Sequence, residues 1–191
     1  LNTATRGSRR EFPSVAVIVA EDDTVTIYDG DDPALPMWMV FNETSGMWGS
    51  GAASATSCFA LNGVLAVGLN GNQGMPVWNF LSDIQYKYDD SIDVREYGSI
   101  SKRNTDNSAN YSIYSTERLV DDTVNDVAMT VLPDAPIDPA TGLPVPTIAA
   151  ATAGGVSVIK DDGTVVDSAL TSEAGSISFT DDNGLLFARH S

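Results

Sequence analysis

The stretch Thr147–Ala169, TIAAATAGGVSVIKDDGTVVDSA, decides the fold. Runs of small and β-branched residues alternate in it with two turns, Ala153-Gly154 and Asp161-Asp162-Gly163. Val, Ile and Thr favour extended strands, whereas Gly and Asp favour turn geometry. The stretch therefore predicts three successive strands, and their expected bounds are 147–152, 155–160 and 164–169.

The same pattern continues toward both ends of the chain. Asn62-Gly63 is the strongest hairpin signal, because both residues accept positive φ. Helical periodicity is nearly absent, so the sequence predicts an all-β domain. Residues 82–123 are more polar, and we expect an outer strand plus an insertion there, with 97–102 pairing with 111–116. The remaining expected strands are 14–20, 24–28, 37–41, 57–61, 64–69, 75–81, 126–132, 176–179 and 185–188.

These strands fall into groups with a similar internal order. Small residues such as Ala149-Ala150-Ala151 suit the inner strands of a β-propeller, where blades crowd around the axis. We therefore predict antiparallel β-propeller-like blades, about two full and two partial. A β-sandwich is the alternative, because it also gives short alternating strands. The expected units are a basic arm at 1–11 and blades at about 12–55, 56–118, 119–172 and 173–191.

The two end units are expected to be incomplete. On the propeller interpretation the N-terminal unit lacks its innermost strand, and the C-terminal unit stops after two strands. An uncovered sheet exposes an apolar face and an open edge. The chain is thus expected to be an arc of a larger ring, a fragment of a longer protein, or a unit completed by another chain.

The excess of acidic residues bears on which partners the chain can bind. The formal net charge is −16, from 26 Asp and Glu against 10 Lys and Arg. Such a surface repels phosphates and anionic lipids, so we expect neither nucleic acid nor a membrane as partner. The acids also suggest a weak Ca²⁺ candidate at Asp29, Asp31 and Asp32, with a solvated turn as the alternative.

The sequence contains no recognisable catalytic motif, and we expect that the protein is not an enzyme. The only histidine is His190, and the only cysteine, Cys58, lies in an apolar run typical of a buried thiol. The acid pairs Asp22-Asp23, Asp161-Asp162 and Asp181-Asp182 all fall in predicted turns. A polysaccharide-degrading enzyme, which would need two such acids close together, is therefore an alternative without a motif.

A few residues are candidates for contact with partners. Trp48 lies in a Gly- and Ser-rich loop, where an aromatic ring could stack on a glycan. Trp38 and Trp78 lie in predicted strands, and we expect them in the core. Arg6, Arg9 and Arg10 form the only basic cluster and could dock an acidic neighbouring subunit, with a solvated arm as the alternative.

Four segments together resemble large virion proteins of marine tailed phages. They are RGSRREFPSVAVIVAE (Arg6–Glu21), YDGDDPALPMWMVF (Tyr28–Phe41), VNDVAMTVLPDAPIDPATGLPVPTIA (Val124–Ala149) and GGVSVIKDDGTVVD (Gly154–Asp167). The resemblance implies a β-propeller-like part of a tail-associated structural protein, located in the virion, with no catalytic motif. Its implied partners are other virion proteins or copies of itself, and the alternative is a module that binds a host surface glycan or receptor.

Overall fold

The computed structural model describes residues 12–42, 53–90, 94–104, 111–114, 117–139, 141–168 and 172–189. Their regular structure is β-strand apart from one short 3₁₀ helix at Ile100–Lys102. All strand pairs are antiparallel. The all-β prediction is therefore confirmed. Within these ranges, no helix is long and apolar enough to cross a membrane.

The described strands form four separate sheets, in each of which spatial order follows chain order. The first sheet holds β1 (Ala16–Glu21), β2 (Thr24–Asp29) and β3 (Met37–Asn42). The second holds β4 (Ala55–Leu61), β5 (Val64–Leu69), β6 (Met75–Asn79), β7 (Ile84–Tyr88), β8 (Val94–Gly98) and β9 (Tyr111–Tyr114). The third holds β10 (Val124–Thr130), β11 (Thr147–Thr152), β12 (Gly155–Ile159) and β13 (Val165–Asp167). The fourth holds β14 (Ala174–Phe179) and β15 (Leu185–Arg189).

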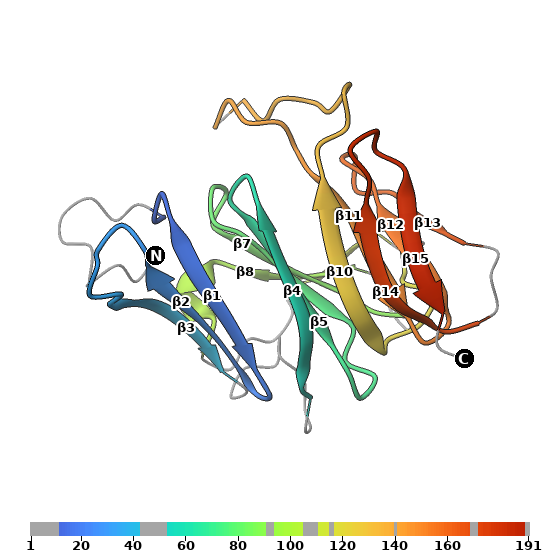
Figure 1. Cartoon of the computed structure of the whole chain (residues 1–191), viewed down its shortest axis with the longest axis horizontal. Helices are drawn as coiled ribbons and strands as arrows, with labels where there is room; N and C mark the ends of the chain where they lie inside the picture. Colours follow the sequence, from blue (N-terminus) through green and yellow to red (C-terminus); the bar gives the residue numbers. More distant parts are fainter. Residues whose placement is uncertain are drawn as a thin grey trace.

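The four sheets are arranged as a fan. The first strand of each sheet lies beside the first strand of the next, so that β1 neighbours β4, β4 neighbours β10, and β10 neighbours β14 (Figure 1). The later strands of each sheet lead away from this row. None of the described sheets closes into a barrel.

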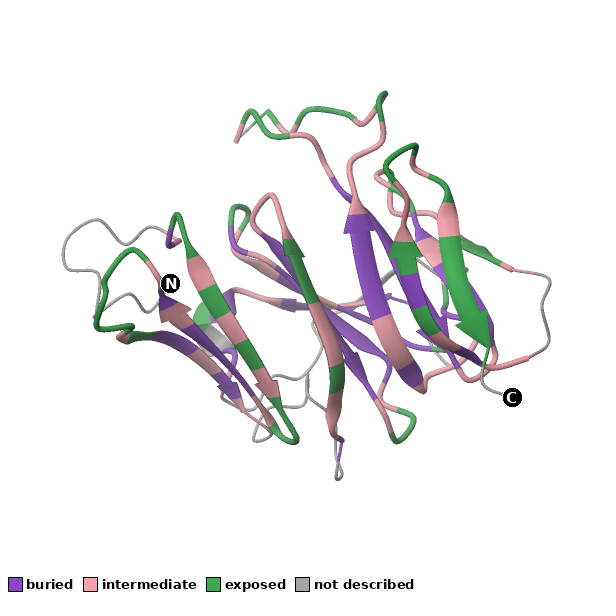
Figure 2. Cartoon of the chain, in the orientation of Figure 1, coloured by how far each residue is buried: buried purple, intermediate pink, exposed green. Residues whose placement is uncertain are grey.

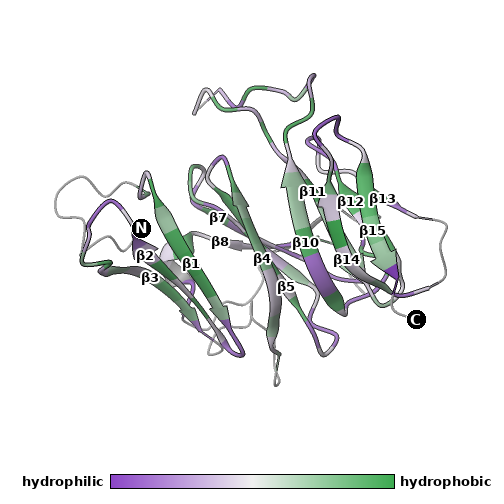
Figure 3. Ribbon diagram, in the orientation of Figure 1, coloured by the Kyte–Doolittle hydropathy of each residue, from purple (hydrophilic) through white to green (hydrophobic). Residues whose placement is uncertain are grey.

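Each inner sheet contributes to two cores because side chains alternate between its faces. On β5, which is buried throughout, Leu65, Val67 and Leu69 pack toward the first sheet. Val64 and Ala66 pack toward the third sheet. The all-buried strand β11 alternates in the same way, with Ala149 and Ala151 in the core shared with the fourth sheet (Figure 2). This two-sided burial explains why β5 is apolar throughout and why β11 is apolar between its terminal threonines (Figure 3).

The polar region 82–123 departs from its prediction. It supplies β7, β8 and β9, which extend the second sheet, in place of an outer strand with an insertion. The expected strand at 111–116 is present as β9, but the pairing expected with 97–102 is wrong: β9 pairs with residues 94–96 of β8, and residues 100–102 form the 3₁₀ helix. The Ser99 side chain caps that helix by accepting from the Ser101 N–H, which ends the strand.

The expectation that the N-terminal unit lacks its innermost strand is wrong. β1 is the strand of the first sheet that neighbours β4, so the inner position is occupied. Its Ala16, Ile18 and Ala20 pack on the core shared with the second sheet. At the other end, the described part of the fourth sheet has the two expected strands.

Candidate functional site

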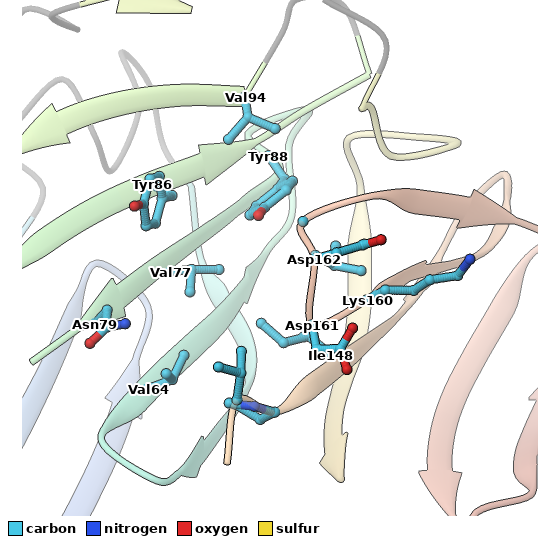
Figure 4. A pocket seen from close by; sticks show the side chains of 14 residues that line it. Val64, Val77, Asn79, Tyr86, Tyr88, Val94, Ile148, Lys160, Asp161 and Asp162 are labelled. Carbon is cyan, nitrogen blue, oxygen red and sulfur yellow. The ribbon is translucent and has the colours of Figure 1, made fainter. Parts of the chain in front are cut away.

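A groove of about 270 Å³ lies between the second and third sheets (Figure 4). Its floor consists of buried apolar side chains from both sheets: Val64, Val77, Tyr88, Val94, Ile148 and Ile159. Its rim carries polar groups: Asn79, Tyr86, Lys160, Asp161 and Asp162. An apolar floor with a few polar groups around it is the usual composition of a small-ligand site.

Strand alternation directs the two tyrosines into the groove. On β7, Tyr86 and Tyr88 lie on the face toward the third sheet, whereas Gln85 lies on the opposite face. There the Gln85 Oε1 accepts a hydrogen bond of 3.1 Å from the buried Trp78 Nε1. Neighbouring residues of β7 therefore serve two different interfaces.

The acidic part of the rim is a turn. The Asp162 Oδ1 accepts hydrogen bonds from the Thr164 hydroxyl at 2.6 Å and from the Thr164 N–H at 2.9 Å. The hydrogen bond from the Thr164 hydroxyl is the largest cause that lowers the pKa of Asp162, and the hydrogen bond from the Thr164 N–H lowers it further. A lowered pKa is the opposite of what a general acid needs, and the predicted turn role of this pair is confirmed. Asp22-Asp23 and Asp181-Asp182 also lie in turns.

Charged groups cluster at the end of β7. Arg95 Nη2 lies 2.9 Å from Asp89 Oδ2, and Lys87 is 5% exposed. Burial lowers the pKa of Lys87, and the nearby Arg95 lowers it further, against the opposite effect of Asp89 and Asp122. Burial also raises the pKa of Asp122 to about 7. The Asp90 N–H, just after β7, donates to the carboxylate of Asp122. Asp122 lies in the segment between the second and third sheets, so this hydrogen bond holds that segment against the end of β7.

A single carboxylate joins the first strands of three sheets. The Asp126 Oδ1 on β10 accepts from the Ser57 hydroxyl of β4 at 2.6 Å. Its Oδ2 accepts from the Ile177 N–H of β14 at 2.9 Å. A charged acceptor makes these hydrogen bonds stronger than neutral ones, so Asp126 fixes the spacing of the row.

The contact residues expected from sequence, Trp48, Arg6, Arg9 and Arg10, lie outside the described residues. Trp38 and Trp78 are in the core as expected, at 3% and 1% exposed. Cys58 is half-buried on β4, and burial raises the pKa of its thiol.

The three acids of the Ca²⁺ candidate are occupied by backbone donors. Asp29 accepts from the Asp31 N–H at 3.1 Å, and Asp32 accepts from the Ala34 N–H at 2.9 Å. Asp31 accepts from the Ser14 and Val15 N–H groups at 2.8 and 3.0 Å. These are turn and strand contacts, and the described ranges contain no group of three or more His, Cys, Asp or Glu placed to hold a metal ion.

Sequence reasoning missed the groove, the charged cluster and Asp126. The alternation IQYKY at 84–88 was the available signal for the tyrosines, since period-two patterning marks a strand. No local signal predicts Asp126, because its partners Ser57 and Ile177 are 69 and 51 residues away.

Comparisons with known proteins give little further guidance. No family model matches the sequence, and no curated protein matches it. A crystal structure of Chaetomium thermophilum Raptor is similar over 91% of this chain, with 13% identity and a TM-score of 0.37. A computationally designed protein, Ika8, is similar over 91%, with 12% identity and a TM-score of 0.29. The chain spans 18% and 57% of those two structures, and scores this low carry no argument about function.

Proposed function

We propose that the chain is a non-catalytic scaffold segment of a phage virion, built of β-propeller-like blades, whose end sheets dock neighbouring virion proteins or further copies. The observation that carries the proposal is the fan of sheets with β1, β4, β10 and β14 side by side. Propeller blades are arranged with their first strands together at the centre. The sequence resemblance to tail-associated virion proteins supplies the viral part of the proposal.

The two outer faces of the fan support a docking role. On β1, Val17 and Val19 alternate with the residues packed on the core and are 40% and 37% exposed. On β15, Leu186 is 60% exposed, on the face opposite to the buried Ile177. In the interior of the fan the equivalent faces are covered by a neighbouring sheet, so these two faces are suited to receive one.

The test is association of the purified chain, measured by sedimentation equilibrium over a range of concentrations. Val17→Asn with Val19→Asn removes apolar surface from the first sheet without changing the charge. We expect the double variant to weaken association about tenfold, since that face loses two exposed valines that association would bury.

The matched control is Ile137→Asn with Leu143→Asn in the proline-rich loop. These side chains are 58% and 40% exposed but belong to neither end face. The control should associate like the wild type. A wild type that stays monomeric at millimolar concentration, or a control that is equally impaired, contradicts docking through the end faces.

A glycan-binding module is the second candidate, and the groove is the observation that favours it. Tyrosine rings combined with an amide and carboxylates at a rim provide stacking and hydrogen bonds for a sugar ring. A glycan array with the wild type and Tyr86→Ala tests this role. Tyr28→Ala, a half-buried tyrosine on β2 away from the groove, is the matched control. Glycan binding that is lost in Tyr86→Ala but kept in Tyr28→Ala supports the glycan role. A wild type that binds no glycan on the array contradicts it.

A further inference from the structure

The fourth sheet covers only part of the third. The third sheet has four strands, whereas β14 and β15 are the described strands of the fourth. The core between the two sheets contains Ala128, Ala149, Ala151 and Ile177. It also contains Val156 of β12, so the core lies under the first three strands of the third sheet and leaves β13 outside it.

The apolar face of the third sheet continues beyond this core. Register places Ala149 beside Val158, and Val158 beside Val166, on the same face. Val158 packs at the border of the core, but Val166 on β13 is 48% exposed. Phe187 of β15 pairs with Ile177 and is 38% exposed. The uncovered part of the interface is therefore bounded by Val166 and Phe187.

The outer edge of β15 is open for main-chain pairing. The Ile177 N–H donates to Asp126, so it is directed away from β15. In an antiparallel pair, opposite residues either bond to each other or both turn outward. Phe187, opposite Ile177, therefore directs its N–H and C=O to the outer edge, where no described strand pairs with it.

We infer that the outer edge of β15 and the apolar strip formed by Val158 of β12 and Val166 of β13 together form a docking site for one added β-strand of a partner chain. The occupant is an extended segment that alternates apolar and polar residues. Its main chain bonds β15, and its apolar residues cover Val166. This mode of binding takes affinity from the backbone and specificity from alternate side chains. This strand-addition site differs from the two outer docking faces, which carry Val17 and Val19 at one end and Leu186 at the other. It uses the edge of the fourth sheet and the face of the third sheet that carries Val158 and Val166.

The probe is a fluorescein-labelled synthetic peptide of residues 154–160, GGVSVIK. This segment contains β12, which is the third strand of the third sheet. The added strand would likewise be the third strand of the fourth sheet, beside β15. Fluorescence anisotropy measures its binding to the full chain, and hydrogen-exchange mass spectrometry locates it. We expect binding, and amide exchange in 185–189 slowed about tenfold at saturation.

Two charge-neutral variants of exposed residues distinguish the site. Val166→Asn should weaken peptide binding about fivefold, because the strip loses its exposed valine. Leu186→Asn, on the outer face of the same hairpin, should bind the peptide like the wild type. The peptide with Val158→Pro should not bind, because proline lacks a main-chain donor.

Three results overturn the inference. One is no slowing of exchange in 185–189 at millimolar peptide. Another is equal loss of binding in Val166→Asn and Leu186→Asn. The third is protection of 185–189 that rises with protein concentration alone, since the occupant is then a second copy. The Val17 and Val19 double variant should bind the peptide normally, so a failure of face docking is distinguishable from a failure of strand addition.

Discussion

Asp126 shows how much of the arrangement depends on single side chains. Its two oxygens join β4 and β14 to β10, and an uncharged aliphatic residue would leave the Ser57 hydroxyl and the Ile177 N–H without this acceptor. The first strands of three sheets would then keep their apolar packing and two side-chain contacts, that of the Thr56 hydroxyl with the Val124 carbonyl and that of the Asn125 amide with the Ala174 carbonyl.

We predict that Asp126→Ala lowers the free energy of unfolding by about 2–3 kcal/mol, because two half-buried donors lose a charged partner. Urea denaturation followed by tryptophan fluorescence measures the change. Asp134→Ala, an exposed acid in the proline-rich loop, is the control and should change stability by less than about 0.5 kcal/mol. Equal effects of the two variants would contradict the proposed role of Asp126.

Asp122 gives the chain a pH dependence. Burial raises its pKa from 3.8 to about 7, assisted by Asp90 and Asp89. The folded state therefore holds this proton more tightly than the unfolded chain, so the stabilisation is full below pH 3.8 and is lost as the pH rises through 7.

We predict that Asp122→Asn becomes more stable relative to the wild type as the pH rises from about 5 to about 8, because the variant has no charge to bury. Its amide oxygen can still accept from the Asp90 N–H. Denaturation midpoints at the two pH values measure the difference, with Asp134→Asn as the control. A constant difference between Asp122→Asn and the wild type across this range would rule out titration of Asp122 as the cause.

At the scale of elements, turns were predictable wherever glycine and asparagine determine the geometry. Asn62-Gly63, with φ of 49° and 74°, forms the expected hairpin between β4 and β5. The loop at 70–74 ends at Gly74, which has φ of 70° and faces the Tyr88 carbonyl of β7. A Cβ at Gly74 would lie 2.1 Å from that oxygen.

We predict that Gly74→Ala destabilises the fold by about 3 kcal/mol, since backbone strain and a main-chain clash add together. Gly142→Ala is the matched control, because Gly142 also has φ of 70° but a Cβ there would meet nothing within 4 Å. The control should cost about 1 kcal/mol. Thermal unfolding compares the two, and equal losses would mean that the close approach to Tyr88 has no energetic effect.

The polar strands were the elements that sequence could not place fully. β7 carries Gln85 and Lys87, and both are buried. Gln85 accepts a hydrogen bond from Trp78, and the carboxylates of Asp89 and Asp122 favour the charge of Lys87. Polar side chains usually indicate exposure, so a buried polar network hides a strand from hydropathy alone. The apolar strands β5 and β11, in contrast, match their predicted bounds of 64–69 and 147–152.

At the scale of the molecule, the large negative charge opposes the proposed association. With a net charge of −16, two copies repel each other at long range. We predict that raising NaCl from about 0.05 to about 0.5 M strengthens self-association several-fold, because salt screens this repulsion. Sedimentation equilibrium at the two salt concentrations measures it. Weaker association at high salt would indicate ion pairs across the interface instead.

The arrangement of the sheets was only partly predictable. Strand sequence and turn chemistry predict the meander within each sheet, since those pairings are local. The row β1, β4, β10 and β14 depends on contacts such as that of Ser57 with Asp126, 69 residues apart, which no local pattern encodes. The groove follows from the same distant packing, which is why its tyrosines were not identified as a site.

The arrangement of the sheets depends on the adjacency of β4, β10 and β14, which NMR can measure. A NOESY spectrum of the uniformly labelled chain should contain cross-peaks between Ser57 and Asp126 and between Asp126 and the Ile177 amide. Their presence, and their loss at the Ile177 amide in Asp126→Ala, is the predicted result. Absence of both contacts, with cross-peaks that instead pair the strands of two facing sheets in a closed sandwich, would contradict the account.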